Sequence, residues 1–124
     1  IIHLGNLSPK RDYIDVRDAA DGFLAVGVSG TVEDGNIETV NLGTGQTSSV
    51  EQVMELVRSL SGIEFQIEQA ADRVKKVDRP NLCASIERIR ERFGWQPSFG
   101  ISASIQALVE NPDLAPDLVR KYML

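Results

Sequence analysis

Charged side chains crowd one short stretch of this sequence, residues 10–18, which read Lys-Arg-Asp-Tyr-Ile-Asp-Val-Arg-Asp. Charges of both signs alternate there with the apolar residues Tyr13, Ile14 and Val16. One interpretation is a strand that runs into a helix cap and presents Arg11 to an anion, because a guanidinium binds phosphate oxygens in pairs. The other is a solvated edge strand whose charges pair with one another. The stretch by itself is compatible with both.

A second concentration of charge lies at residues 72–79. Basic and acidic residues alternate there: Asp72, Arg73, Lys75, Lys76, Asp78 and Arg79. The whole chain has a formal net charge of −5, so a local basic cluster stands out. A functional interpretation is a clamp on a small anionic ligand such as a diphosphate. A solvated loop with local ion pairs is the alternative.

Few other residues have types or spacings that suggest chemistry. The Gly-Thr-Gly sequence at 43–45 lacks the third glycine of a dinucleotide-binding turn, so we expect a tight turn there rather than a phosphate loop. His3 is the only histidine and Cys83 the only cysteine, which excludes an internal disulfide and leaves no spacing for a catalytic pair. We expect Cys83 to be a small buried apolar group. The sequence predicts no catalytic residue and no metal ligand.

Length and composition indicate one soluble globular domain. The chain has 124 residues, of which 42% are hydrophobic and 25% charged. The negative net charge argues against nucleic acid or an acidic membrane as a partner. No apolar run approaches the roughly 18 residues of a membrane span, and no signal peptide is visible, so we expect a cytoplasmic location. Because the chain begins at Ile1 in the middle of an apparent strand, we expect a piece of a longer polypeptide.

Hydrophobic periodicity and capping signals place the elements that must position these residues. The first predicted helix begins at Asp15 and ends at the glycines at 27 and 30. The second begins after Ser49, which forms a capping box with Gln52, and the third begins after Ser85. Two more helices are predicted over 101–109 and 116–124. Strands are predicted at 1–4, 11–14, 38–42 and 63–67, with a loop at 68–80 and a short extended piece at 82–84. Alternating strands and helices indicate an α/β class, a small mixed domain with four to five helices.

Several of these signals occur together, in one order and with compatible spacing. They are Leu-Gly-Asn-Leu at 4–7, Arg-Asp-Tyr-Ile-Asp-Val-Arg-Asp at 11–18, Asn-Leu-Gly-Thr-Gly at 41–45, Asp-Arg-Pro at 78–80 and Phe-Gly-Trp-Gln-Pro at 93–97. The set resembles the C-terminal part of the NAD-dependent epimerase/dehydratase family, extended short-chain dehydrogenases that act on nucleotide sugars. Leu-Gly-Asn-Leu followed by Lys-Arg-Asp is most similar to the GDP-mannose dehydratase branch, and Asp-Val-Arg-Asp is more similar to the GDP-deoxymannose reductases. UDP-sugar epimerases share the Arg-Asp-Tyr-Ile part.

The resemblance implies a set of substrate-binding residues: Asn6, Arg11, Arg73, Lys75 and Asp78. In the family, the arginine at the place of Arg11 and a basic residue at the place of Lys75 contact the diphosphate, and Asp78 is placed to accept from a ribose hydroxyl. Lysine at 75 replaces the family's usual arginine and lacks the paired N–H donors of a guanidinium. Arg73 could supply these donors instead.

The resemblance also implies what the chain lacks. The family binds NAD or NADP through a glycine-rich turn and transfers protons with a Tyr-x-x-x-Lys pair. Neither occurs here: Tyr13 is followed four residues later by Arg17. We therefore expect residues 1–124 to form a substrate-binding domain that binds no cofactor alone. An N-terminal Rossmann half of the parent enzyme would supply the hydride and proton chemistry, so the isolated chain is predicted to be inactive.

Two alternatives stay open. The chain could be a stand-alone, non-catalytic nucleotide-sugar-binding module, or a protein that acts only through contacts. Without a Rossmann half, apolar faces near residues 39–42 would be exposed, which favours a homodimer.

Overall fold

The computed structural model describes residues 1–29, 36–75 and 78–111, and the described part is a small α/β fold with four α-helices and short strands. In chain order the elements are β1 (Ile2–Leu4), β2 (Lys10–Arg11), α1 (Val16–Ser29), β3 (Ser48–Ser49), α2 (Val50–Ser61), β4 (Ile67–Gln69), a 3₁₀ turn (Ala71–Arg73), β5 (Asn81–Leu82), α3 (Glu87–Phe93) and α4 (Ile101–Glu110).

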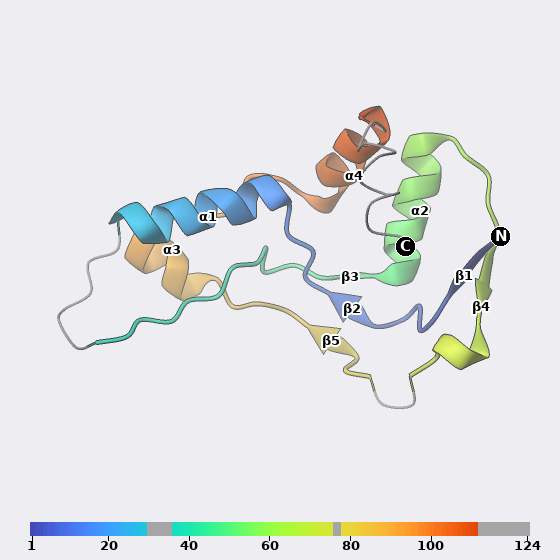
Figure 1. The fold of residues 1–124 in the computed structure, drawn as a ribbon, viewed down its shortest axis with the longest axis horizontal. Helices are drawn as coiled ribbons and strands as arrows, with labels where there is room; N and C mark the ends of the chain where they lie inside the picture. Colours follow the sequence, from blue (N-terminus) through green and yellow to red (C-terminus); the bar gives the residue numbers. More distant parts are fainter. Residues whose placement is uncertain (30–35, 76–77, 112–124) are drawn as a thin grey trace, which may run out of the picture.

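The strands form two small sheets (Figure 1). In the first, β1 and β4 are parallel, with Ile2 opposite Ile67. In the second, β2 is central, antiparallel to β3 and parallel to β5. Two helix pairs complete the fold: α1 packs against α3, and α2 packs against α4. The three-stranded sheet thus brings together three segments that are far apart in the sequence, close to the start of α1.

Local sequence signals correctly predicted the ends of several helices. Ser49 and Gln52 form the predicted capping box at the start of α2, and Gly62 ends this helix with a φ of 66°. Gly94 ends α3 in the same left-handed conformation, with a φ of 65°. Asp15 caps α1, because its Oδ1 accepts from the amide N–H of Arg17 at 2.9 Å. These ends depend on neighbours within four residues, which is why sequence alone predicted them.

The predicted strand at 38–42 is wrong. These residues pair with no strand in the described part of the chain, and a strand is defined by its partner. Arginines of α3 hold the segment instead: Arg88 Nη1 donates to the carbonyl of Thr39 at 3.0 Å, and Arg92 pairs with Glu38 at 3.0 Å. The segment therefore has no partner strand among the described residues.

Other boundaries also differ from prediction. The strand expected at 63–67 begins only at Ile67, and the expected loop at 68–80 includes the rest of β4 and a 3₁₀ turn. Ser85 does not cap α3, whose N-cap is Ile86 without a side-chain bond. Gly27 does not end α1, and Cys83 is exposed rather than buried. The helix predicted at 116–124 and the stop at Gly30 lie outside the described residues.

The described core is small, and α1 turns its apolar face away from it. The buried apolar side chains are Ile89, Trp95 and Ile105. Helix α1 packs inward through Gly22, whereas its predicted apolar face is exposed, with Val16 at 79% and Phe23 at 71%. Periodicity identified the apolar stripe correctly but could not say what covers it.

Gly22 and Gly27 make a matched test of this packing. A Cβ at Gly22 would lie 2.3 Å from Leu42 Cδ2 and 3.1 Å from Trp95 Cε2, whereas at Gly27 it would meet nothing within 4 Å. We expect G22A to lower the free energy of unfolding by about 1–3 kcal/mol through overpacking. G27A should raise it by about 0.5–1 kcal/mol through helix propensity. Urea unfolding measures both, and equal effects would contradict this packing.

Candidate functional site

The carboxylate of Asp78 joins two residues that the sequence places far from it. Arg11 Nη2, at the end of β2, donates to Asp78 Oδ1, and Asn6 Nδ2 donates to Asp78 Oδ2 at 3.2 Å. Asn6 Nδ2 also donates to the backbone carbonyl of Lys75 at 3.2 Å. Arg11 Nη1 donates to the carbonyls of Lys10, at 2.7 Å, and Arg79, at 2.9 Å. An arginine, an amide and a carboxylate therefore meet at the junction of three segments.

Strand pairing and one glycine bring these segments together. Parallel pairing sets β2 beside β5, and the amide of Lys10 donates to the carbonyl of Pro80 at 2.9 Å, which carries Asp78 to Arg11. On the other side, a Cβ at Gly5 would lie 2.5 Å from the carbonyl oxygen of Arg73. Only glycine allows the turn before Asn6 to approach the 3₁₀ turn so closely.

The five predicted site residues divide into two groups. Asn6, Arg11 and Asp78 are in direct contact. Lys75 contributes only its carbonyl, and its side chain is exposed. The guanidinium of Arg73 donates to the carbonyl of His3 at 2.8 Å, so it is bonded to β1. Arg73 therefore has a structural contact that its place in the basic cluster did not indicate.

Asp12 occupies the place where an anion would bind at the Gly-Thr-Gly turn. Its carboxylate accepts from the backbone N–H groups of Thr44 at 2.8 Å, Gly45 at 3.0 Å and Ala84 at 3.2 Å, and from the Thr44 hydroxyl at 2.6 Å. Amides already bonded to a carboxylate cannot cradle a phosphate. The Gly-Thr-Gly turn is therefore a tight structural junction, as expected, held by Asp12.

Asp15 and Asp18 connect the start of α1 to α4. Asp15, with only 7% of its surface exposed, accepts from Arg17 Nη2 at 2.8 Å and from the Ser104 hydroxyl at 2.6 Å. The hydrogen bonds from Arg17 hold the pKa of Asp15 well below its usual range, against the opposing effect of burial. Asp18 accepts from the backbone N–H groups of Ser98 and Phe99, both at 2.9 Å. The interpretation of this stretch as a solvated edge strand is therefore wrong.

Arg17 is not available for proton transfer beside Tyr13. Its guanidinium is bonded to Asp15 and lies 3.7 Å from the centroid of the Phe99 ring. Hydrogen bonding to Asp15 raises the pKa of Arg17 further above its usual value. A group held so firmly in its charged form cannot exchange protons near neutral pH.

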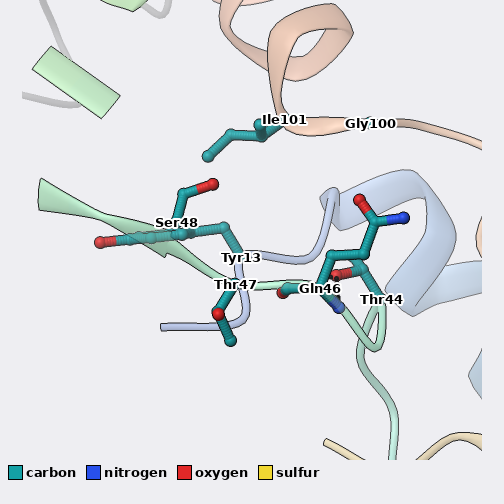
Figure 2. Close-up of a pocket in the computed structure, with 7 residues that line it drawn as sticks. All are labelled: Tyr13, Thr44, Gln46, Thr47, Ser48, Gly100 and Ile101. Atoms are coloured by element: carbon teal, nitrogen blue, oxygen red, sulfur yellow. Dashed lines mark hydrogen bonds between the residues drawn. The ribbon is translucent and has the colours of Figure 1, made fainter. Parts of the chain in front are cut away.

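A hollow near the ends of β2 and β3 was not anticipated from the sequence. The turn before β3 supplies one side and the start of α4 the other (Figure 2). Its lining combines polar side chains with the Tyr13 ring and one aliphatic side chain: Tyr13, Thr44, Gln46, Thr47, Ser48, Gly100 and Ile101. Residues from three separate segments form the hollow, so no local sequence signal could have found it.

Two other features are absent from the described ranges. No helix there is long and apolar enough to cross a membrane. No group of three or more His, Cys, Asp or Glu side chains there is arranged to hold a metal ion.

The described residues form a small α/β unit with four helices and short strands, in which Asn6, Arg11 and Asp78 meet. A family model described as GDP-mannose 4,6 dehydratase matches residues 1–108. The chain belongs to the NAD-dependent epimerase/dehydratase family.

Among curated relatives, GDP-6-deoxy-D-mannose reductase of Pseudomonas aeruginosa is 24% identical over 89% of this chain and 35% of its own length. UDP-glucose 4-epimerase of Streptococcus mutans is 37% identical over 72% of this chain and 26% of its own length. The chain thus spans about a quarter to a third of these relatives.

Solved structures show the same fold. The Pseudomonas aeruginosa enzyme RMD, complexed with NADPH, superposes with a TM-score of 0.76 and 24% identity, covering 89% of this chain and 35% of that one. A UDP-glucose 4-epimerase of Thermotoga maritima, solved with UDP-glucose, gives a TM-score of 0.71 and 23% identity, covering 99% of this chain and 36% of that one.

The lowered pKa of Asp15 predicts a pH effect on stability. A group whose pKa is lower in the folded state stabilises the fold above its usual pKa of 3.8, and this contribution is lost as the pH falls below that value. We expect D15N to cost about 1–3 kcal/mol at neutral pH and to flatten the acid side of the stability curve. Exposed Asp21, in the same helix, provides the control D21N. Parallel acid curves for D15N and the wild type in urea unfolding would contradict the assignment.

Proposed function

We propose that this chain is the nucleotide-sugar-binding part of an NAD(P)-dependent epimerase, dehydratase or reductase. The observation that carries the proposal is the convergence of Asn6, Arg11 and Asp78 from three distant segments. An arginine from β2 and a carboxylate from the segment before β5 are the two chemistries that a nucleoside diphosphate needs, one for phosphate and one for a ribose diol.

Arg11 retains donors for a diphosphate. A guanidinium has five N–H groups; Nη1 uses two, on the carbonyls of Lys10 and Arg79, and Nη2 uses one, on Asp78. Nε and the second hydrogen of Nη2 have no partner among the described residues. The exposed Lys75 side chain would supply a second, less directional cation. Arg73 would add positive charge but no paired N–H contacts with phosphate oxygens. A ribose hydroxyl would use a further lone pair of Asp78.

The second part of the proposal is a partner. The exposed apolar face of α1 and the unpaired edge at 38–42 both suit a docked Rossmann half, which would add a strand and cover the helix. That half would bind NAD or NADP, which supplies hydride transfer. The present residues would only bind and orient the sugar nucleotide, which is catalysis by positioning. The reaction type and a cytoplasmic location stay predictions.

A stand-alone binding module is the second candidate. The closed Arg11–Asp78 ion pair favours it, because the site is already assembled without a Rossmann half. The coding sequence upstream of Ile1 distinguishes the two. A Gly-x-x-Gly-x-x-Gly turn and a Tyr-x-x-x-Lys pair encoded in frame there would support the enzyme, and their absence would support the module.

Replacing Arg11 tests the binding site. We expect R11Q to weaken binding of GDP-sugars or UDP-sugars at least about tenfold, because a charge-assisted phosphate contact is lost. R90Q, at an exposed arginine of α3, makes the same charge change away from the site and should bind like the wild type. Isothermal titration calorimetry measures both, and purified chain with NAD(P)H should show no turnover.

Two results would overturn this assignment. A folded wild-type chain that binds neither class of nucleotide sugar would favour a protein acting only through contacts. Equal losses in R11Q and R90Q would show that bulk charge rather than the Asp78-linked arginine attracts the ligand.

Replacing Phe23 tests the docking face. Without its partner, the wild-type chain should self-associate through α1, as an exposed apolar face does in water. We expect F23E to be monomeric and no less stable, because Phe23 is exposed. I63E replaces an apolar residue of similar exposure after α2 and should associate like the wild type. Sedimentation velocity measures this, and a monomeric wild type would argue against the face.

A further inference from the structure

We propose that Asn6 is a positioning residue: it fixes the carboxylate of Asp78, and through it the guanidinium of Arg11, in the orientation that meets a diphosphate. The last step rests on the proposed function. The first two steps concern contacts of the free protein and can be tested without any ligand.

The amide of Asn6 is committed to the protein. Its Nδ2 has two hydrogens, and both find acceptors at 3.2 Å, one on Asp78 Oδ2 and one on the carbonyl of Lys75. The backbone before it is held close to the 3₁₀ turn by Gly5, so the side chain approaches from a fixed position. A half-buried amide with both hydrogens used is better suited to orient neighbours than to bind a ligand through its nitrogen.

The two oxygens of Asp78 receive different donors, and this fixes the plane of the carboxylate. Oδ2 is held by Asn6 and Oδ1 by Arg11 Nη2. If Asn6 is removed, the carboxylate can rotate about its side-chain torsions, and Arg11 retains only the two carbonyl contacts of Nη1. Because a planar guanidinium needs its direction set to bind two phosphate oxygens at once, loss of this third contact weakens diphosphate binding in particular.

Asn6 also connects the two sides of the site. Its Nδ2 donates to the carbonyl of Lys75 and so holds the main chain at that residue. One amide thus sets both the carboxylate that orients the arginine and the main chain that carries the second cation. Truncation of Asn6 should therefore lower diphosphate affinity more than the loss of one exposed hydrogen bond would.

The experiment uses N6A, N6D and the control N36A, at an exposed asparagine of the described chain. N6D has nearly the same size but cannot donate when ionised, and it sets a second carboxylate against Asp78. Without ligand, NMR of the Arg11 Nη2–H signals should show faster exchange with water in N6A and N6D than in the wild type and N36A, because Nη2 donates to Asp78. An unchanged signal in N6A and N6D would overturn the proposal.

With ligand, calorimetry compares GDP and UDP with the corresponding monophosphates. We expect N6A to lose about tenfold in diphosphate affinity and less for the monophosphate, and N6D to lose more. In an R11Q background, N6A should add little, because the two residues act through one contact. Full additivity, or equal losses for di- and monophosphates, would overturn the proposal while R11Q still tests the site. If the wild type binds no nucleotide, the proposed function fails and the NMR result alone decides the role of Asn6.

Discussion

Backbone N–H groups bonded to three aspartate carboxylates hold this small fold together. Asp12 accepts from the turn before β3 and from the chain after β5, Asp15 from the first turn of α1, and Asp18 from the segment before α4. Loop amides that folding takes partly out of water need such partners, because a fully buried unpaired donor costs about 1–3 kcal/mol. The strands are only two or three residues long, and three apolar side chains are buried in the described part of the chain. In this small fold, the three carboxylates therefore hold loops and helices together, as a larger apolar core does in bigger domains.

The candidate site depends on the same arrangement. Arg11 directly precedes Asp12, so the carboxylate that joins the Gly-Thr-Gly turn to the chain after β5 also fixes the end of β2. Parallel pairing with β5 then delivers Asp78 to Arg11. The two neighbouring charges thus have different partners: Arg11 pairs with the side chain of Asp78, and Asp12 binds backbone N–H groups. A substitution at Asp12 would displace Arg11 as well as weaken the fold.

The apolar stripe of α1 faces outward, and this is the second feature that constrains the fold. A helix that packs through Gly22 and exposes Phe23 has its close contacts on the side without the apolar stripe. The neighbouring segment at 38–42 is extended, bonded to α3 arginines, and without a strand partner in the described chain. Both features are compatible with a second layer that the present residues do not supply, in a chain that spans about a third of its relatives.

The sequence by itself determined the α/β class, the caps at Asp15, Ser49, Gly62 and Gly94, and the family, because caps and motifs depend on residues close together in the chain. It also indicated Arg11 and Asp78 separately, through the resemblance. Only the tertiary structure decided that these two meet, that Arg73 bonds to β1 instead, and that the stripe of α1 faces outward. Such outcomes depend on which distant segment pairs with which, and neither periodicity nor local charge carries that information.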